Sequence, residues 1–581
     1  MAGREWSGAN LLHACGLPET WAGNAQWRVL AAGTDAALNF LAAWHAWKED
    51  PKRPRLLHVV MIEPQPVSAD ELVRAASRHP ELAALADELA AQWFGLMPGA
   101  HRVAFEQGRV LLTLHVNELS PVLRRESFVA DSVLLGVVDA ASVKALSRHC
   151  ERGTRFAALT ASPEALTELA QCGFVTATSA PSATSDALVT GQFLPSWEPK
   201  QRARASAATP STCIVIGSGL AGSAVAASLA RRGWDVHVLD GAAQPASGAS
   251  GAPVAMLAPH FSPDDSMLSK LSRAGVRMTL QQAREHIVEG EDFGAAGVLE
   301  LRDVEAHEFN AAEAPWSRPA SDGELMGALA RADAQGLWHG QAAWIKPAAL
   351  VAAWLAQPKV QWQGNSRAAQ CLRDGDTDQW IVVDAQGIEL GRAALVVVAA
   401  ALESGSLAGT ELPLQAVRGQ ISWGTQPIGA LPPFPINGNG HFIPAVPLAG
   451  ETGWFCGSTF DRGDSSGDTR EQDHAANLAR LRDLLPSAAA AIESEFTNHS
   501  VSAWTGVRCA SSNRRPLAGQ LQAGLWVSTA MGSRGLTFCA LCAEVLAARL
   551  HDEPLPIETR LADALAPTTP NQPARAVASA G

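Results

Sequence analysis

No apolar run in this chain approaches the roughly 20 residues that a helix needs to cross a bilayer. The first six residues also lack the apolar core of a secretory signal. Hydrophobic residues make up 47% of the chain and charged residues 18%, which is typical of a globular protein with a sizeable core. We therefore expect a cytoplasmic protein without a membrane partner.

Cysteine is scattered, and none of the nine cysteines stands in the spacing of a zinc site. The one close pair, Cys539 and Cys542, falls in an apolar helical pattern, which favours packing over redox chemistry. We expect a reduced protein with no metal site.

Blocks of like charge are also absent, and the formal net charge is −13. Nucleic-acid-binding proteins normally carry a basic footprint, so this balance argues against a polyanionic partner. An acidic net charge does not exclude such a partner, however, because only one surface of the protein has to be positive. The basic residues that could contribute to such a surface are Lys200, Arg202, Arg204, Arg231, Arg232, Arg514 and Arg515.

What is present indicates two modules, because 581 residues are too many for one ordinary domain. Residues 1–180 alternate strand and helix patterns, which predicts an α/β module built on a parallel sheet. Residues 181–211 are rich in Ser, Thr, Ala and Pro, and are interpreted as a linker. The second module covers residues 212–567, and residues 568–581 have the composition of a disordered tail.

A glycine motif opens the second module, where Cys213–Gly222 predicts a strand, a turn and a helix start. Gly217 forms the tight turn, Gly219 admits backbone N–H groups to a pyrophosphate, and Gly222 lets the helix pack closely on the sheet. Asp240 lies near the separation of roughly 20 residues expected of the acid that binds a ribose hydroxyl. The pattern indicates a dinucleotide cofactor.

Two later segments predict further contacts to that cofactor. Ala246–Gly251, which includes Ser250, offers small side chains and backbone donors just after the acid. Near the chain end, the strand Leu525–Thr529 leads into a glycine-rich turn and an apolar helix, whose N-terminus would stabilise negative charge on a reduced flavin. A turn that merely caps the helix is the structural alternative. The residues expected at this turn are Gly532, Gly535, Leu536 and Thr537.

Six segments of the second module, in one collinear order, resemble the FAD-dependent half of the bifunctional tRNA 5-methylaminomethyl-2-thiouridine biosynthesis (MnmC) family. They are Ile214–Gly222, Ala246–Gly251, Ala416–Ser422, Gly457–Arg462, Gly506–Ser511 and Gly532–Thr537. That half belongs to the D-amino-acid oxidase and glycine oxidase superfamily. The resemblance implies a Rossmann-type FAD domain with an antiparallel substrate sheet, and tRNA as the partner.

The resemblance also implies a reaction at the wobble uridine, in which a 5-carboxymethylaminomethyl group loses its carboxymethyl part and leaves 5-aminomethyl-(2-thio)uridine. The removed part is a glycine bonded through nitrogen, so its α-carbon gives a hydride to the flavin and the imine hydrolyses to release glyoxylate. Such a site needs a guanidinium that orients the carboxylate. Related glycine oxidases place this arginine where Arg508 stands. Arg534, near the flavin turn, and Arg418, with a structural ion pair as its alternative role, are the other candidates.

The first module resembles the methyltransferase half of the same family. Leu38–Trp44 matches the family, and Glu63 stands where its acid holds the ribose of S-adenosylmethionine. The glycine-rich loop, however, is reduced to Gly33–Ala37, where Asp35 puts a side chain at a position that needs bare backbone. The catalytic loop is missing before a helix that starts at Ala140. We expect a degenerate Rossmann-like domain without methyl transfer.

Three other functions stay open at this point. The protein could be fully bifunctional and also methylate the aminomethyl product with S-adenosylmethionine. Its second module could instead oxidise a free glycine-like amino acid such as sarcosine. The chain could also be a noncatalytic RNA-binding scaffold that keeps a flavin as a structural ligand.

Overall fold

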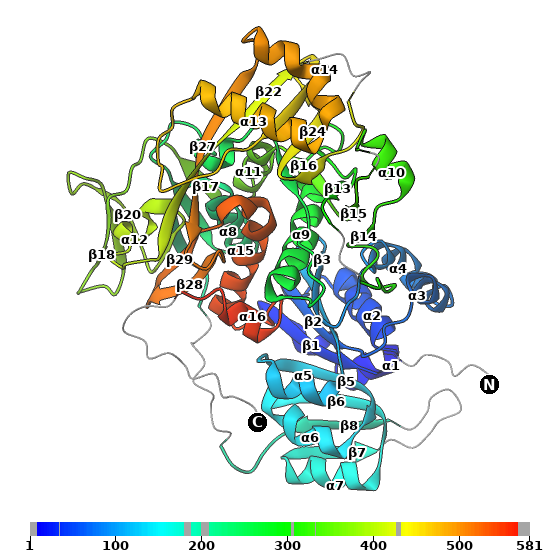
Figure 1. The fold of residues 1–581 in the computed structure, drawn as a ribbon. Helices are drawn as coiled ribbons and strands as arrows, with labels where there is room; N and C mark the ends of the chain where they lie inside the picture. The colour runs from blue at the N-terminus through cyan, green and yellow to red at the C-terminus, as the bar shows by residue number, and fades with distance from the viewer. Residues whose placement is uncertain are drawn as a thin grey trace, which may run out of the picture. The chain divides into compact units, whose positions relative to one another are not determined.

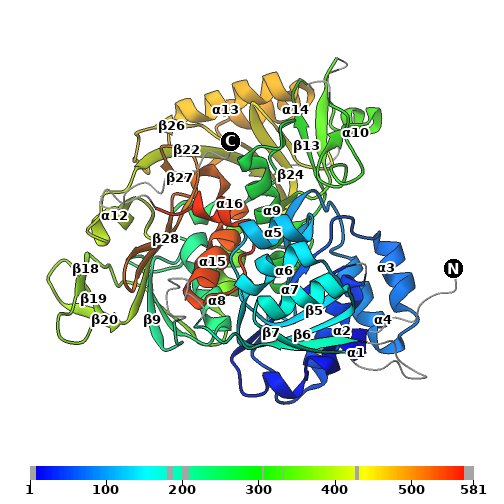
Figure 2. The ribbon, with the colours of Figure 1, turned by 90° about the horizontal axis from the view of Figure 1, so that it is seen from below.

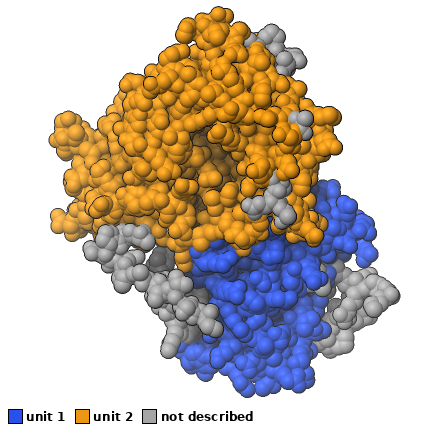
Figure 3. All heavy atoms as spheres, in the orientation of Figure 1, with its two compact units in different colours: residues 1–209, 547–562 blue, residues 210–546, 563–581 orange. Residues whose placement is uncertain are grey.

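The computed structural model describes residues 8–33, 35–178, 188–198, 208–303, 307–331, 333–425 and 431–567. The predicted tail, 568–581, lies outside the described residues, as do 181–187 and 199–207 of the predicted linker. Contacts divide the chain into two compact units (Figure 1, Figure 3). Unit 1 consists of residues 1–209 and 547–562, and unit 2 of residues 210–546 and 563–581.

Residues 547–562, which the sequence assigned to the second module, therefore cluster with unit 1. Their polar contacts show why. Arg102 donates from Nη2 to the carbonyl of Pro554 at 2.6 Å, and the Glu126 carboxylate accepts from the backbone and the hydroxyl of Thr559, both at 2.8 Å. These partners are hundreds of residues apart in the chain, so local patterns could not predict them.

Unit 1 is built on an eight-stranded sheet in the order β3-β4-β2-β1-β5-β6-β8-β7 (Figure 1). The central strands β4, β2, β1, β5 and β6 are parallel, as the alternating pattern predicts. β3, β7 and β8 pair antiparallel, which the sequence did not predict. The strands are β1 Gln26–Ala32, β2 Leu56–Ile62, β3 Gly99–Phe105, β4 Val110–Val116, β5 Ala130–Val138, β6 Cys150–Ala161, β7 Phe174–Thr178 and β8 Val189–Phe193.

Helices cover both faces of this sheet, because alternate strand residues point to opposite sides. Val29 and Ala31 of β1 pack with α1 to α4, whereas Leu30 and Ala32 pack with α5 to α7 (Figure 2). The helices are α1 Gly8–Ala14, α2 Ala36–Glu49, α3 Ala69–Ala76, α4 Ala83–Ala90, α5 Leu119–Arg125, α6 Ala140–Leu146 and α7 Pro163–Gln171.

Strand β8 lies within residues 181–211, which their composition led us to interpret as a linker. Val189 and Phe193 are buried, and β8 fills the space between β6 and β7. At Gly191 a Cβ would lie 2.8 Å from the carbonyl oxygen of Val175, so this close approach needs glycine. Sequence composition reads such a strand as a linker, because its short apolar pattern is interrupted by small and polar residues.

Unit 2 has a six-stranded sheet in the order β17-β10-β9-β21-β29-β28, in which only β28 is antiparallel. Helix α8 packs on this sheet and against α11, and the small sheet β18-β19-β20 shares the apolar core of the other face. The strands are β9 Thr212–Ile216, β10 Asp235–Leu239, β17 Val360–Gln363, β18 Gln370–Arg373, β19 Trp380–Val383, β20 Glu389–Ala393, β21 Leu395–Val398, β28 Leu517–Gln522 and β29 Leu525–Thr529. The helices are α8 Leu220–Arg231, α9 Met267–His286, α11 Pro347–Leu355, α12 Ser404–Leu407 and α15 Gly535–His551, which continues into unit 1 from residue 547 on. Helix α16 Thr559–Asp563 belongs to unit 1 except for its last residue.

The second part of unit 2 is a nine-stranded, mainly antiparallel sheet in which β22 pairs with β25, β26 and β27. Helices α13 and α14 cover one face, and the small sheet β11-β16-β12 contributes Trp344 to the core of the other (Figure 1). The strands are β11 Ala255–Leu257, β12 Phe293–Gly294, β13 Val298–Leu301, β14 Arg318–Pro319, β15 Gly336–His339, β16 Ala343–Ile345, β22 Leu414–Thr425, β23 Ile436–Gly438, β24 Gly440–Leu448, β25 Glu451–Gly457, β26 Asp461–Arg462 and β27 Ser502–Ser511. The helices are α10 Asp322–Gly327, α13 Glu471–Leu484 and α14 Pro486–Thr497.

Among the residues described, no helix is both long and apolar enough to cross a membrane. Within the same ranges, no group of three or more His, Cys, Asp or Glu side chains is arranged to hold a metal ion.

Candidate cofactor and substrate site

The glycine motif lies where the strand order of the parallel sheet of unit 2 reverses, between β9 and β21. Ligands of such sheets bind in the crevice at the carboxyl ends of these strands. Gly217 ends β9 with φ +107°, and a Cβ there would lie 2.6 Å from the carbonyl oxygen of Ala399. The turn therefore requires glycine for both its conformation and its space.

The start of α8 is equally close-packed. A Cβ at Gly222 would lie 1.9 Å from the carbonyl oxygen of Gly217, so only glycine lets the helix approach the strand end. A Cβ at Gly219 would lie 3.0 Å from Ser250 Oγ, which accepts a hydrogen bond from the Leu220 backbone at 2.9 Å. The structure thus brings Ser250 to the N-terminus of α8, as expected of residues that share one ligand.

Asp240 follows β10 and reaches back to the glycine turn. Its Oδ2 accepts from the backbone and hydroxyl of Ser218 at 2.7 and 2.6 Å, and its Oδ1 accepts from the Ala242 backbone at 2.8 Å. These bonds hold the carboxylate at the strand end, and Oδ1, which accepts a single bond, keeps a second lone pair for a hydroxyl. Its contact with a ribose stays a prediction.

The late glycine turn joins β29 to α15 and lies beside β27. Gly532 has φ +59°, and Met531 forms an isolated bridge with Ala510. Helix α9 packs on the start of α15, where the Thr279 hydroxyl donates to the Leu536 carbonyl at 2.6 Å. These contacts fix the turn, so the N-terminus of α15 is a rigid, partly positive element.

Arg508 extends from β27 across β22 and reaches the loop after β25. Its Nη2 donates to Ser458 Oγ at 2.6 Å, whereas its Nη1 is buried without a hydrogen-bond partner in the described chain. A buried, unsatisfied guanidinium nitrogen is costly unless a ligand completes it. Burial also lowers the pKa of Arg508 below its usual value, although a guanidinium stays charged at neutral pH.

The surroundings of Arg508 include three residues to which the sequence gave no role. Gly419 of β22 lies under the guanidinium, since a Cβ there would be 2.4 Å from Nη1. The ring of Phe460 has its centroid 5.7 Å from the Arg508 Cζ atom. Burial, together with the charge of Arg508, lowers the pKa of His441 to about 4, so this imidazole is neutral at physiological pH. Gly419 and Phe460 stand inside motifs that resemble the family, which is the signal that could have found them.

The side chain of Arg534, in the turn before α15, makes no hydrogen bond or ion pair with the residues described, whereas its backbone donates to the Met531 carbonyl at 3.2 Å. Burial lowers its pKa, as does the nearby charge of Arg514, and Glu300 acts in the opposite direction. Glu300 accepts from His339 at 3.0 Å, and His339 is in turn bonded to the Ser317 hydroxyl at 2.9 Å. Sequence reasoning missed this chain, because its members come from distant strands and match no local motif.

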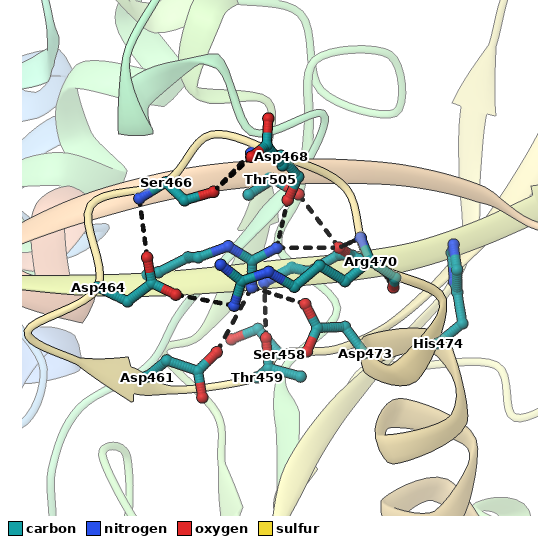
Figure 4. Close-up of polar contacts among 12 residues, drawn as sticks. Ser458, Thr459, Asp461, Asp464, Ser466, Asp468, Arg470, Asp473, His474 and Thr505 are labelled. Carbon is teal, nitrogen blue, oxygen red and sulfur yellow. Dashed lines mark hydrogen bonds and ion pairs between the residues drawn. The ribbon is translucent and has the colours of Figure 1, made fainter.

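Arg418 has a different position from that expected of a substrate-binding residue. Its side chain is 0% exposed, and Nη1 donates to Asp473 at 2.6 Å and to Asp461 at 3.4 Å. Nη2 donates to Gln420 Oε1 and to the carbonyl of Asp468, and Figure 4 shows the acids gathered at this point. Both terminal nitrogens are occupied, so the alternative role, a structural ion pair, is the one that the geometry gives Arg418.

The corresponding edge of unit 1 carries the positions predicted for S-adenosylmethionine. Gly33 has φ +109° and faces Gly136, whose nitrogen would lie 3.2 Å from a Cβ on Gly33. Burial raises the pKa of Asp35 and of Glu63, and the charge of Glu118 adds to the shift of Glu63. Thr34 of this loop lies outside the described residues.

The connection from β5 to α6 in unit 1 is as short as the sequence predicts. β5 ends at Val138, α6 begins at Ala140, and the Asp139 carboxylate caps the helix by accepting from the Ala141 backbone at 3.2 Å. Asp139 alone thus connects the strand to the helix.

Comparisons with known proteins agree with this geometry. The family of FAD dependent oxidoreductases (DAO) matches residues 212–549. The tRNA 5-methylaminomethyl-2-thiouridine biosynthesis bifunctional protein MnmC of Polaromonas naphthalenivorans is 47% identical, over 98% of this chain and 94% of its own. That of Verminephrobacter eiseniae is 45% identical, over 96% of this chain and 98% of its own. The crystal structure of glycine oxidase from Geobacillus kaustophilus has a TM-score of 0.50 at 19% identity, covers 62% of this chain and 99% of its own, and supports the fold alone.

Proposed function

Because the chain belongs to the MnmC family, and its residues 212–549 to the FAD dependent oxidoreductases, we propose that it modifies the wobble uridine of tRNA in the cytoplasm. The reaction is the oxidative removal of the carboxymethyl group from 5-carboxymethylaminomethyl-(2-thio)uridine, which leaves 5-aminomethyl-(2-thio)uridine. The observation that carries this proposal is the unpaired Nη1 of Arg508, placed in the motif that holds a substrate carboxylate in related glycine oxidases.

The residues of unit 2 fit FAD. Gly217 and Gly222 let the turn and the helix start pack closely at the strand ends, Gly219 lies against Ser250, and Asp240 is held at the same turn, which is the arrangement that a pyrophosphate and a ribose require. The turn residues Gly532, Gly535, Leu536 and Thr537 would face the ring with the N-terminus of α15. When bound, FAD supplies the acceptor for the hydride that leaves the α-carbon of the substrate.

The protein's own residues bind and orient the glycyl group. Arg508 offers two parallel N–H groups to the carboxylate, and Ser458 fixes the plane of the guanidinium by accepting from Nη2. Arg534 supplies a second positive charge in the turn before α15. Because the His441 imidazole is neutral, it adds no competing charge beside the Arg508 guanidinium. No protein nucleophile is needed, so positioning and charge are the main contributions.

Substitution of Arg508 tests the proposal. Arg508→Ala should lower kcat/KM by about 100- to 1000-fold. The kcat/KM of Arg508→Lys should lie between those of Arg508→Ala and the wild type, because an ammonium group keeps the charge but cannot form two parallel bonds. The assay is mass spectrometry of wobble nucleosides after incubation with tRNA that carries the carboxymethylaminomethyl group, and the flavin absorbance should be unchanged. Full activity of Arg508→Ala, or a wild-type protein that cannot be loaded with FAD, would contradict the proposal.

Unit 1, we propose, is a methyltransferase-type domain that has lost methyl transfer. The order β4-β2-β1-β5-β6 with its switch between β1 and β5 supports the fold class. The direct connection from β5 to α6 and the carboxylate of Asp35 support the loss. Glu63 and the positive φ of Gly33 favour the second candidate, a fully bifunctional enzyme. Titration with S-adenosylmethionine decides, because saturable heat in the micromolar range would establish the second candidate.

Oxidation of a free glycine-like amino acid is the other alternative for unit 2. It predicts that sarcosine or glycine reduces the flavin as fast as the modified tRNA does. Parallel incubations with tRNA and with either amino acid separate the two substrates. The noncatalytic scaffold predicts tight tRNA binding and no flavin reduction with any of them.

A further inference from the structure

Phe460 is exposed in a way that its position in the fold does not explain. It is 46% exposed and is, among the described residues, the one phenylalanine with so open a side chain. It lies in the short segment between β25 and β26, directly after Ser458 and Thr459. A partner that covers this exposed ring removes apolar surface from water, which stabilises the complex.

Two guanidinium groups flank this ring. The Cζ atom of Arg508 lies 5.7 Å from the ring centroid, and that of Arg462 lies 5.8 Å from it. Arg508 is the buried group that we assign to the substrate carboxylate, whereas Arg462 is exposed. Phe460 is therefore an exposed ring beside both a buried and an exposed guanidinium group.

The side chain of Arg462 has no hydrogen bond or ion pair with any residue that the structure describes. The acids of the same segment are already engaged. Asp461 accepts from Arg418 at 3.4 Å, and Asp464 pairs with Arg470 at 2.8 Å (Figure 4). The charge of Arg462 is thus left for an anion from outside the protein.

The chemistry of the substrate matches this arrangement. In the proposed substrate, a methylene, an amine and a second methylene separate the carboxylate from the uracil ring. If Arg508 holds the carboxylate, this short tether keeps the base beside the clamp, where Phe460 offers an open ring face. Single-stranded RNA bases that leave the helix commonly stack on such rings, with cations on the adjacent phosphates. A free amino acid would leave Phe460 uncovered.

We propose that Phe460 is the stacking surface for the wobble base and that Arg462 binds a phosphate of the anticodon loop. The inference rests on the proposed function, since it assumes that the glycyl group reaches Arg508 while attached to RNA. It gives the site its preference for a nucleotide-linked glycine over a free one.

Equilibrium binding tests the inference separately from catalysis. The probes are two fluorescently labelled anticodon stem-loops, one with the carboxymethylaminomethyl uridine and one with plain uridine at the wobble position. Phe460→Ala should weaken binding of both by about 5- to 150-fold, the range seen for loss of one stacked base, and Phe460→Trp should restore it. Arg508→Ala should weaken binding of the modified loop alone, because only that loop carries the carboxylate.

Arg462→Ala should weaken both loops and lower the slope of log K against log salt by about 1, as expected for one lost phosphate contact. Matched controls are Ile388→Ala, an exposed apolar side chain at 62%, and Arg331→Ala, an arginine whose side chain is 65% exposed. Both should bind like the wild type.

Two results would overturn the inference. If Phe460→Ala binds both loops with dissociation constants within twofold of the wild type, the ring contacts no base. Loss of binding for the modified loop alone means that Phe460 acts through Arg508. If wild-type protein converts modified tRNA while either result is obtained, only this inference fails. If wild type neither binds nor converts the RNA, the proposed function itself fails.

Discussion

Gly419→Ala is the most specific test of the substrate clamp, which consists of Arg508 and Ser458, because it displaces the Arg508 side chain and leaves its chemical groups unchanged. An added Cβ would lie 2.4 Å from Arg508 Nη1, 2.5 Å from Nη2 and 2.7 Å from Cζ, all inside the 3.0 Å that real Cβ contacts respect. To reach an ordinary contact of 3.4 Å, Nη1 has to move by about 1 Å. That movement would stretch the 2.6 Å bond from Nη2 to Ser458.

A displacement of about 1 Å in a substrate-positioning group costs on the order of 100-fold in rate, or about 2.7 kcal/mol of transition-state stabilisation. We expect this loss in kcat/KM for modified tRNA. The atoms that clash are at the far end of a flexible side chain, so the free energy of unfolding should change by less than about 1 kcal/mol. Steady-state conversion and urea unfolding measure the two quantities.

Gly467→Ala is the matched control, since nothing lies within 4 Å of a Cβ there and the residue is exposed. It should keep wild-type kcat/KM. Wild-type activity of Gly419→Ala would refute the placement of Arg508 over Gly419. Equal losses in stability and activity would refute the idea that the effect is confined to the clamp.

Three further substitutions test the electrostatics of unit 2. Asp473→Asn leaves the buried Arg418 charge with weaker partners and should lower the free energy of unfolding by about 3–5 kcal/mol, measured by urea titration. Burial raises the pKa of Glu544, but the charges of Arg232 and Arg231 lower it more, so that it lies below the unfolded value of about 4.3. The ionised carboxylate therefore stabilises the fold at pH values above about 4.3, and this stabilisation is lost as the pH falls further. Glu544→Gln should therefore be less stable at pH 7 and lose less stability on acidification, and parallel curves would contradict this. The pKa of His441 is about 4 in the native state against about 6.5 unfolded, so acidification from pH 6.5 to 4 costs stability that His441→Gln should retain in thermal unfolding.

Elements that depend on consecutive residues could be predicted from the sequence alone. The turn at Gly217 needs a positive φ and a close approach, and glycine alone satisfies both, so its motif predicts the strand, the turn and the helix that follow. The direct step from β5 to α6 in unit 1 is likewise local, because Asp139 is the only residue between the two elements.

The different surroundings of the two arginines became visible only in the tertiary structure. Arg418 and Arg508 come from paired strands, with Val417 opposite Arg508 in the register, and both lie in motifs that resemble the family. Arg418 has both terminal nitrogens engaged, by Asp473 and its neighbours, whereas Arg508 crosses Gly419 and keeps one terminal nitrogen, Nη1, without a hydrogen-bond partner among the described residues. Which of them can bind a substrate depends on partners far away in the chain, and no local pattern encodes those. The same reason hid β8, which pairs with β6, and the place of residues 547–562, whose contacts with unit 1 join residues far apart in the chain.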